Sequence, residues 1–212
     1  MPDKSDASPR QPIPNDILKV IQKHCQSTDD EMRWLVALLS DTGMRLSEAV
    51  GLLRDDINLE GNIPIVDIRP HPWRRLKTAQ SERKIPLVGY SLWAAKQALK
   101  ASEDSFLFPK YCSKGGCNSN SASAALNKWL KQIAGSAYVI HSFRHSMRDR
   151  LRTVNCPSDM IDQMGGWSSR NVGERYGDGH SLESIMRYIG QITELTNNPQ
   201  SSHGQFADNH RD

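Results

Sequence analysis

The sequence has no long apolar run. Nowhere in its 212 residues is there a stretch near the roughly 18 apolar residues that a membrane-spanning helix needs. The first ten residues also lack the apolar core of a secretory signal peptide. We therefore expect a globular cytoplasmic protein that does not associate with a membrane.

Clusters of metal ligands are also scarce. Four cysteines are present, at Cys25, Cys112, Cys117 and Cys156, and in the cytoplasm they are expected to be reduced thiols. Cys112 and Cys117 are five residues apart, but no second Cys or His pair at ligand spacing follows them. No paired carboxylates accompany the basic stretches of the chain, which argues against a metal-dependent nuclease. We expect neither a metal nor another cofactor.

The net charge is only +3 and does not by itself indicate a nucleic-acid partner. Basic residues are nevertheless concentrated in two stretches, each containing a single acid. They are Arg69, Arg74, Arg75, Lys77, Arg83 and Lys84 in the first, and Arg144, Arg148, Arg150 and Arg152 in the second. Either stretch alone is typical of a solvated surface. The two together favour a polyanion, and we expect double-stranded DNA as the partner.

One ordered domain is expected, over residues 15–195. Residues 1–14 are rich in Ser, Pro, Asp and Lys and lack apolar periodicity, which predicts a disordered segment. The polar residues 196–212 are predicted to form a mobile tail. No internal repeat and no linker divides the chain into two cores.

The periodicity of apolar residues predicts a mainly helical fold. Helices are expected over residues 16–24, 28–41, 47–53, 90–101, 121–133, 141–154, 158–164, 169–176 and 182–195. The pattern from Thr28 to Glu31 resembles a capping box, and Gly43 is placed to end that helix in a left-handed conformation. Short extended segments punctuated by prolines, over residues 63–68, 73–77 and 83–87, predict strands. The expected fold class is α+β, mainly α, with a small three-stranded antiparallel sheet on one edge.

Two motifs carry residues suited to phosphate chemistry. In T-G-M-R-L-S-E-A, Arg45 lies between two predicted helices, where a guanidinium suits a phosphate oxygen; a salt bridge to Glu48 is the alternative. In H-S-F-R-H-S, Arg144 follows His141 by three residues, so both share one helix face and could hold a phosphate while moving a proton. His145 is expected to face elsewhere.

Four motifs occur in order along the chain. They are T-G-M-R-L-S-E-A, K-T-A-Q-S-E-R-K-I-P-L, H-S-F-R-H-S, and G-G-W-S-S with a tyrosine nine residues after its tryptophan. Together they resemble the catalytic domain of tyrosine recombinases, the phage integrase family, over about residues 42–176. The resemblance implies a site-specific recombinase or integrase of a bacterium, phage or other mobile element. Such an enzyme cleaves and rejoins DNA through a covalent 3′-phosphotyrosine, without metal or ATP.

The resemblance also implies which groups hold the scissile phosphate. Arg45 and Arg144 would bind its non-bridging oxygens, and Glu48 would support Arg45 from behind. Trp167 stands where many members have histidine, and its indole N–H can still donate to a phosphate oxygen. Further contacts to DNA are expected from Arg74, Arg75, Arg83 and Arg148.

The remaining implied groups move protons or attack phosphorus. Tyr176 would be the nucleophile, and His141 would take or return its proton. Lys77 would protonate the leaving 5′ oxygen, although Lys84 and Arg75 compete for that role because the length of the hairpin varies in the family. A second tyrosine after the motif, Tyr188, has the wrong spacing for a nucleophile and is expected to pack within a helix.

Two other functions share part of this pattern. A type IB topoisomerase uses the same kinds of catalytic side chain, and a DNA-binding accessory protein would use the basic surface without cleavage. Family members usually carry a further helical domain before the catalytic one, so the sequence is expected to be the catalytic part of a longer protein, with a naturally short protein as the alternative. The apolar stripe of the helix Leu182–Leu195 could dock on a neighbouring protomer of a homo-oligomer, expected to be a tetramer on DNA, or pack on its own domain.

Overall fold

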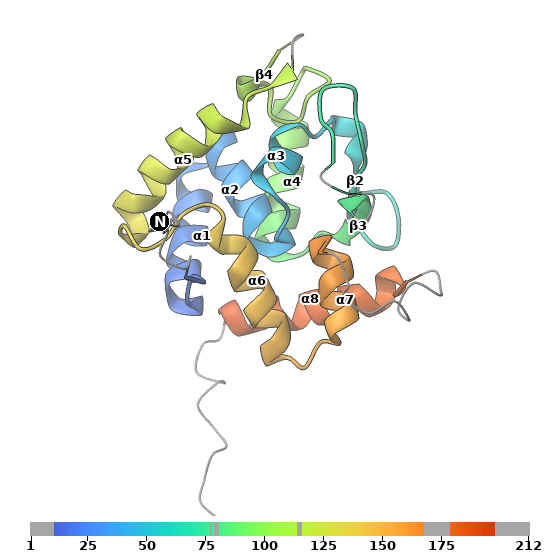
Figure 1. Cartoon of the computed structure of the whole chain (residues 1–212). Coiled ribbons are helices and arrows are strands. Elements are labelled where there is room, and N and C mark those ends of the chain that lie inside the picture. Colours follow the sequence, from blue (N-terminus) through green and yellow to red (C-terminus); the bar gives the residue numbers. More distant parts are fainter. Residues whose placement is uncertain (1–10, 77, 79–80, 114–115, 168–178, 198–212) are drawn as a thin grey trace, which may run out of the picture.

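A computed structural model describes residues 11–76, 78, 81–113, 116–167 and 179–197 of the chain. Helices pack around one apolar core, with a small sheet on one side (Figure 1). The helices are α1 (Asn15–Thr28), α2 (Glu31–Thr42), α3 (Leu46–Val50), α4 (Gly89–Ala101), α5 (Ser119–Ala134), α6 (Ser142–Thr153), α7 (Ser158–Gly165) and α8 (Leu182–Asn197). They confirm the predicted helices to within a few residues, except the one over 169–176, which lies outside the described residues. No described helix is long and apolar enough to cross a membrane.

The second helix, α2, forms the centre of the core. Its residues from Leu35 to Thr42 are all buried, and it packs against α1, α4 and α6. It begins after Asp30, whose carboxylate accepts a hydrogen bond from the first turn at 3.0 Å. The cap is therefore Asp30 and not the predicted Thr28, which ends α1. The helix stops at Gly43, whose φ of 59° is the predicted left-handed conformation, and the chain turns there towards α3.

The sheet has three antiparallel strands in the order β1 (Ile57–Asn58), β2 (Ile65–Ile68) and β3 (Arg83–Pro86). Its inward side chains are Ile57, Val66, Ile68 and Ile85. The predicted strand over 73–77 is wrong: His71 and Arg74 bond to each other across a tight turn instead. The first strand is only two residues long, too short for an alternating pattern to reveal it.

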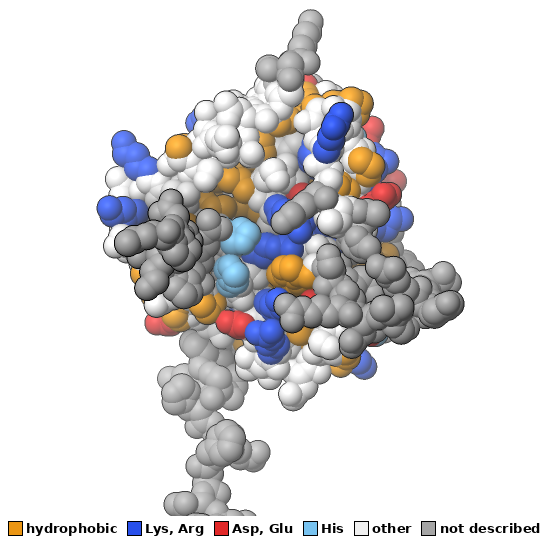
Figure 2. Space-filling model, in the orientation of Figure 1, with side chains coloured by type: hydrophobic (Ala, Val, Ile, Leu, Met, Phe, Trp, Pro, Cys, Tyr) orange, Lys and Arg blue, Asp and Glu red, His pale blue; other side chains and the backbone are white. Residues whose placement is uncertain are grey.

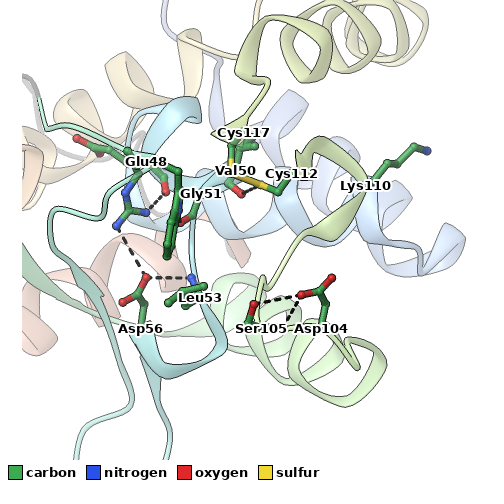
Figure 3. Close-up of a disulfide and its surroundings, with 12 residues drawn as sticks. Glu48, Val50, Gly51, Leu53, Asp56, Asp104, Ser105, Lys110, Cys112 and Cys117 are labelled. Carbon is green, nitrogen blue, oxygen red and sulfur yellow. Dashed lines mark hydrogen bonds and ion pairs between the residues drawn. A yellow bond between two sulfur atoms is a disulfide. The ribbon is translucent and has the colours of Figure 1, made fainter. Parts of the chain in front are cut away.

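A second, two-stranded ladder carries a disulfide between Cys112 and Cys117 (Figure 3). Its strands are β4 (Cys112–Ser113) and β5 (Gly116–Cys117). The two cysteines face each other across this hairpin, with Cα atoms 4.1 Å apart, and this register brings their sulfurs together. The prediction that they are reduced thiols is therefore wrong for this pair. Cys25 and Cys156 are buried free thiols, as predicted.

The folded domain extends beyond residues 15–195 at both ends. Ile13 is buried, and its N–H donates to Ser146 Oγ at 2.6 Å. Thr196 is also buried, and its hydroxyl accepts a hydrogen bond from Arg150 at 3.0 Å. Both ends are thus tied to α6, and these positions belong to the core and not to the disordered segment and tail predicted for them.

The last helix, α8, packs on its own domain. Ile185, Ile189 and Ile192 are buried against β3, α1 and α6. Its outward positions are polar: Glu183, Arg187, Gln191 and Glu194 are exposed. The sequence left open whether the apolar stripe packs on its own domain or on a neighbouring protomer, and in this structure it packs on its own domain.

Candidate active site

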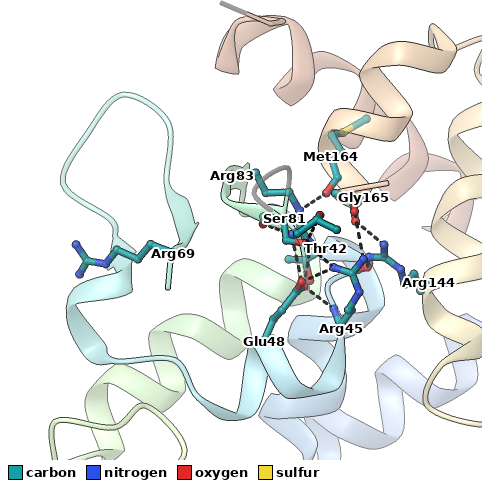
Figure 4. A network of polar contacts seen from close by, with 12 residues as sticks. Thr42, Arg45, Glu48, Arg69, Ser81, Arg83, Arg144, Met164 and Gly165 are labelled. Carbon is teal, nitrogen blue, oxygen red and sulfur yellow. Dashed lines mark hydrogen bonds and ion pairs between the residues drawn. The ribbon is translucent and has the colours of Figure 1, made fainter. Parts of the chain in front are cut away.

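Three of the six predicted catalytic side chains meet at the junction of α3, α6 and the end of α7. They are Arg45, Arg144 and Trp167, and the polar network around the two arginines is drawn in Figure 4. His141 directly precedes α6. Lys77 and Tyr176 lie outside the described residues. Figure 2 shows Lys or Arg side chains beside histidine side chains in the middle of the face that carries this junction.

Arg45 is held by the start of α3 and by the loop after α7. Its backbone N–H donates to Glu48 Oε2 at 2.8 Å and its guanidinium to Glu48 Oε1 at 2.6 Å. The other guanidinium nitrogen donates to the carbonyl of Gly166 at 3.2 Å. The salt bridge that the sequence offered as an alternative is therefore present, and it also orients the guanidinium towards the cluster. Arg45 remains half-buried, so part of its guanidinium is accessible.

Glu48 is the carboxylate that joins two arginines of this cluster. Besides Arg45, Glu48 accepts a hydrogen bond from Arg83 Nη2 at 3.0 Å. The side chains of Arg83 and Glu48 are each only 4% exposed. Burial alone would raise the pKa of Glu48, but the charge of Arg83 and the hydrogen bonds from both arginines hold its pKa below the usual value. The carboxylate is therefore ionised and shared between a half-buried and a buried guanidinium.

Arg74 and Arg83, which were predicted to contact DNA, lie in the interior. They are 5% and 7% exposed. Arg74 donates to two backbone carbonyls, and Arg83 binds Glu48 and donates through Nε to a carbonyl in the last turn of α7 at 2.7 Å. The prediction of direct DNA contact is corrected for both, because their side chains are buried and their terminal nitrogens bind groups inside the protein. Arg75 is exposed and Arg148 is half-buried, so both are still available to a partner.

Arg144 is a buried cation with carbonyl partners. It is 4% exposed, and its two terminal nitrogens donate to the carbonyl of Gly43 at 2.8 Å and to that of Gly165. Burial, followed by the like charges of Arg45 and Arg83, lowers the pKa of Arg144 to about 9. Carbonyl dipoles offset its charge less than a carboxylate would, so an anion placed beside it would be stabilised strongly.

The G-G-W motif follows from the packing of its tryptophan. The Trp167 ring lies directly on Gly165, where an added Cβ would come within 1.8 Å of ring carbons. Gly166 has a φ of 58°, and an added Cβ there would lie 2.8 Å from Arg83. The ring stacks against Arg144, whose guanidinium carbon is 4.2 Å from the ring centroid. Both glycines are therefore needed to bring the indole to the arginine.

His141 is exposed at the start of α6 and lies beside a hollow of about 280 Å³. The hollow is lined by Met44, Leu46, Ser123, Asn127, Val139, Ile140 and His141. The prediction that His145 faces away from His141 is wrong: the two rings meet edge-on, with centroids 5.2 Å apart. One turn of helix separates the two residues, so their rings lie along the same face.

The charges of the cluster do not balance. Three guanidiniums, those of Arg45, Arg83 and Arg144, lie in this cluster, and Glu48 is the only carboxylate among the described residues that forms an ion pair with any of them. Among the described residues there is no group of three or more His, Cys, Asp or Glu that could hold a metal ion. The arrangement suits an anion with several oxygens, such as a phosphodiester, which would complete the charge balance and accept several hydrogen bonds at once.

Replacing Glu48 with glutamine tests the role of that carboxylate in stability. The change removes the charge between Arg45 and Arg83 but keeps the shape, and we expect the free energy of unfolding to fall by about 1.5–3 kcal/mol. Because folding lowers the pKa of Glu48 from 4.5, its stabilisation is present above that pH and lost as the pH falls below it.

Urea unfolding of both proteins at several pH values measures this effect, and the difference between their free energies of unfolding should narrow as the pH falls below 4.5. Asp149→Asn is the control, because it removes a carboxylate from an ion pair that is half exposed or more on both sides. An equal loss of stability in the two variants would contradict the prediction.

Comparison with models of known families gives one match. The sequence profile of the phage integrase family matches residues 13–181. None of the curated proteins matches the sequence.

Several solved structures share the fold. The integrase of the transposon Tn1549, in complex with circular intermediate DNA, superposes with a TM-score of 0.60 at 16% identity, covering 88% of this chain and 67% of that one. The XerH site-specific recombinase, bound to its palindromic difH substrate, gives 0.58 at 17% identity, with 94% and 55% covered. The XerA recombinase gives 0.58 at 16% identity, with 97% and 68% covered. This chain thus spans between about half and two thirds of those proteins.

Proposed function

Because the chain belongs to the phage integrase family, we propose that it is a site-specific DNA recombinase that cuts and rejoins strands through a covalent 3′-phosphotyrosine. The observation that best supports this is Arg144, a buried cation that forms no ion pair with a carboxylate in the part of the chain that the structure describes, next to Arg45 and Trp167. The bound DNA of the Tn1549 integrase and of XerH supports double-stranded DNA as the ligand. A cytoplasmic location fits the same role.

In this proposal the arginines act on the scissile phosphate. Arg45 and Arg144 bind its two non-bridging oxygens, and their fixed hydrogen bonds to the protein keep them oriented before DNA arrives. The extra negative charge of the pentavalent transition state then meets cations that need no rearrangement. The low pKa of Arg144 means that a phosphate beside it is favoured more than beside a solvated arginine.

The covalent step exchanges one phosphodiester bond for another. The Tyr176 oxygen attacks phosphorus and the bond to the 5′ oxygen breaks, leaving a 3′-phosphotyrosine and a 5′ hydroxyl. The tyrosine proton passes to a base, with His141 in that role, and Lys77 supplies the proton of the 5′ oxygen. Because the phosphotyrosine bond keeps the energy of the broken one, a second 5′ hydroxyl can reverse the attack without ATP.

We also propose that the protein acts as a homo-oligomer on DNA. The apolar stripe of α8 is buried in its own domain, so an interface through this helix would use its polar outward face or require the helix to leave its site. Arg75 is exposed, and in this proposal it contacts the DNA backbone, so DNA binding should weaken steeply with added salt.

The proposal is tested by covalent capture. The purified protein is mixed with a pool of nicked duplexes whose central sequence is randomised, so that the fragment released by cleavage diffuses away and the adduct is trapped. We expect a denaturant-resistant protein–DNA complex, and the captured strands give the recognition sequence. Proteolysis and mass spectrometry should place the nucleotide on Tyr176 and not on Tyr188.

Two results would contradict the proposal. A folded protein that binds the pool but never forms an adduct is a DNA-binding accessory protein. A protein that relaxes supercoiled plasmid at unselected sequences, with no preference in the captured strands, is a type IB topoisomerase.

A further inference from the structure

Trp167 touches two guanidiniums, and only one of them is accounted for by the proposed phosphate site. Arg144 stacks on the ring at 4.2 Å, and Arg148 stacks on it at 4.9 Å, measured from the guanidinium carbon to the ring centroid. The two arginines are four residues apart in α6, so they project from the same face one turn from each other. The indole therefore contacts the side chains of two consecutive turns of one helix.

The contacts of Arg148 tie it to α7, the helix that precedes the tryptophan. Its Nη2 donates to the carboxylate of Asp162 in α7 at 3.2 Å, while the backbone carbonyl of Asp162 accepts a hydrogen bond from the backbone N–H of Trp167 at 3.0 Å. Its Nε is buried and has no hydrogen-bond acceptor among the described residues. Burying that donor has a cost that hydrogen bonding does not offset, and stacking on the ring is the contact that can compensate for it.

The tryptophan depends on these side contacts for its orientation. Gly165 offers it a surface without a side chain, which supports the ring but does not by itself fix the χ1 and χ2 torsions of the side chain. A cation on each of two consecutive turns favours one ring orientation, because each guanidinium is attracted to the ring face. The direction of the indole N–H is then set before DNA binds.

We propose that Arg148 is a positioning residue that orients Trp167, and through it Arg144, for the scissile phosphate. This role differs from a contact to the DNA backbone, which was the expectation from the sequence. It rests on the proposed recombinase function for its effect on rate. Its effect on Trp167 can be measured without any cleavage.

The first measurement observes the ring directly. The protein is labelled with 5-fluorotryptophan, and the resonance of Trp167 is identified by its absence in Trp167→Phe. Arg148→Met keeps an unbranched apolar side chain but removes the cation, and we expect it to move or broaden the Trp167 resonance. Arg152→Met is the matched control: it removes an arginine from the same helix whose side chain is 60% exposed and paired with Asp149.

The second measurement separates rate from affinity. The sequence of the captured DNA is used to make a nicked suicide substrate. The rate of single-turnover cleavage is measured at a saturating protein concentration. The dissociation constant for the same DNA is measured separately. We expect Arg148→Met to slow cleavage about tenfold while the dissociation constant changes less than about threefold, because the loss is one of orientation. Arg148→Lys, which keeps a cation that can lie over the ring face although it loses the planar contact, should recover most of the rate. In a Trp167→Ala background, Arg148→Met should have little further effect.

Each other outcome overturns the inference. An unmoved Trp167 resonance in Arg148→Met shows that Arg148 does not orient the ring. A rise in the dissociation constant with an unchanged cleavage rate makes Arg148 a plain DNA contact. If Arg148→Met and Arg152→Met change the Trp167 resonance and the cleavage rate equally, the effect comes from the loss of a positive charge in α6 and not from the orientation of the ring. If wild-type protein forms no adduct at all, the recombinase proposal fails, whereas the fluorine spectra still test whether Arg148 positions the indole.

Discussion

Tyr176→Phe should abolish covalent capture of DNA altogether. Phenylalanine differs from tyrosine only by the phenolic oxygen, which is the atom that would bond to phosphorus, so no slower route to the adduct remains. Binding should stay within about twofold, because the DNA backbone is held by cations that the substitution does not touch. Capture on the nicked substrate and fluorescence anisotropy measure the two quantities separately.

Tyr188→Phe is the matched control for that substitution. Tyr188 lies within α8, half-buried on the surface of the core, and its ring contacts Arg187. Its loss should leave capture unchanged. Capture that survives in Tyr176→Phe and disappears in Tyr188→Phe would move the nucleophile to α8 and contradict the assignment.

Arg144→Lys should lower the single-turnover cleavage rate by about 10²–10³-fold. A lysine keeps the charge but is a point donor, so it cannot reach the carbonyls of Gly43 and Gly165 and also face a phosphate oxygen. The planar contact with Trp167 is lost as well. The rate on the captured suicide substrate is the measurement, at protein concentrations that saturate the DNA.

Stability must be measured beside that rate. Because Arg144 is buried and holds two loops, its replacement also weakens the fold, and the cleavage assay is run at a temperature where circular dichroism shows the variant to be native. Arg152→Lys, at an exposed position of the same helix, should cleave at the wild-type rate. A folded Arg144→Lys protein with wild-type activity would remove this arginine from the proposed chemistry.

Local sequence patterns predicted the helices and the position of Arg45, the first residue of the candidate active site along the chain. Helical periodicity and a glycine with a left-handed conformation depend on residues close in sequence, and these gave the end of α2 and the position of Arg45. The sequence resemblance supplied the order of the motifs. The pairing of Arg45 with Glu48 was also accessible, since the two are three residues apart.

The wrong predictions for Arg74 and Arg83 concern contacts between segments far apart in the chain. Whether an arginine is a surface cation or a buried one depends on the carbonyls and carboxylates that another segment brings to it, and no pattern around Arg74 contains that information. The error about the disulfide is local: the bond follows from a hairpin register that places Cys112 opposite Cys117. Sequence alone could have suggested it only by treating the loop between them as a hairpin.

The burial of Arg83 had one signal that was overlooked. Arg83 lies two residues before Ile85 in the same strand, so the two side chains share the inward face of the sheet and point into the core. An inward arginine needs an acid, and Glu48 is the one that the structure supplies.

Each of the two arginines of the proposed phosphate site donates a hydrogen bond to the segment that holds the other arginine. Arg144 donates to the carbonyl of Gly43, two residues before Arg45, and Arg45 donates to the carbonyl of Gly166, next to the one that Arg144 binds at Gly165. Neither guanidinium can be displaced without loosening the support of the other. The effects of losing the two arginines are therefore coupled. The cleavage rate of a protein lacking both should fall much less than the product of the two single reductions. Natural variation at this site should change both arginines jointly or neither.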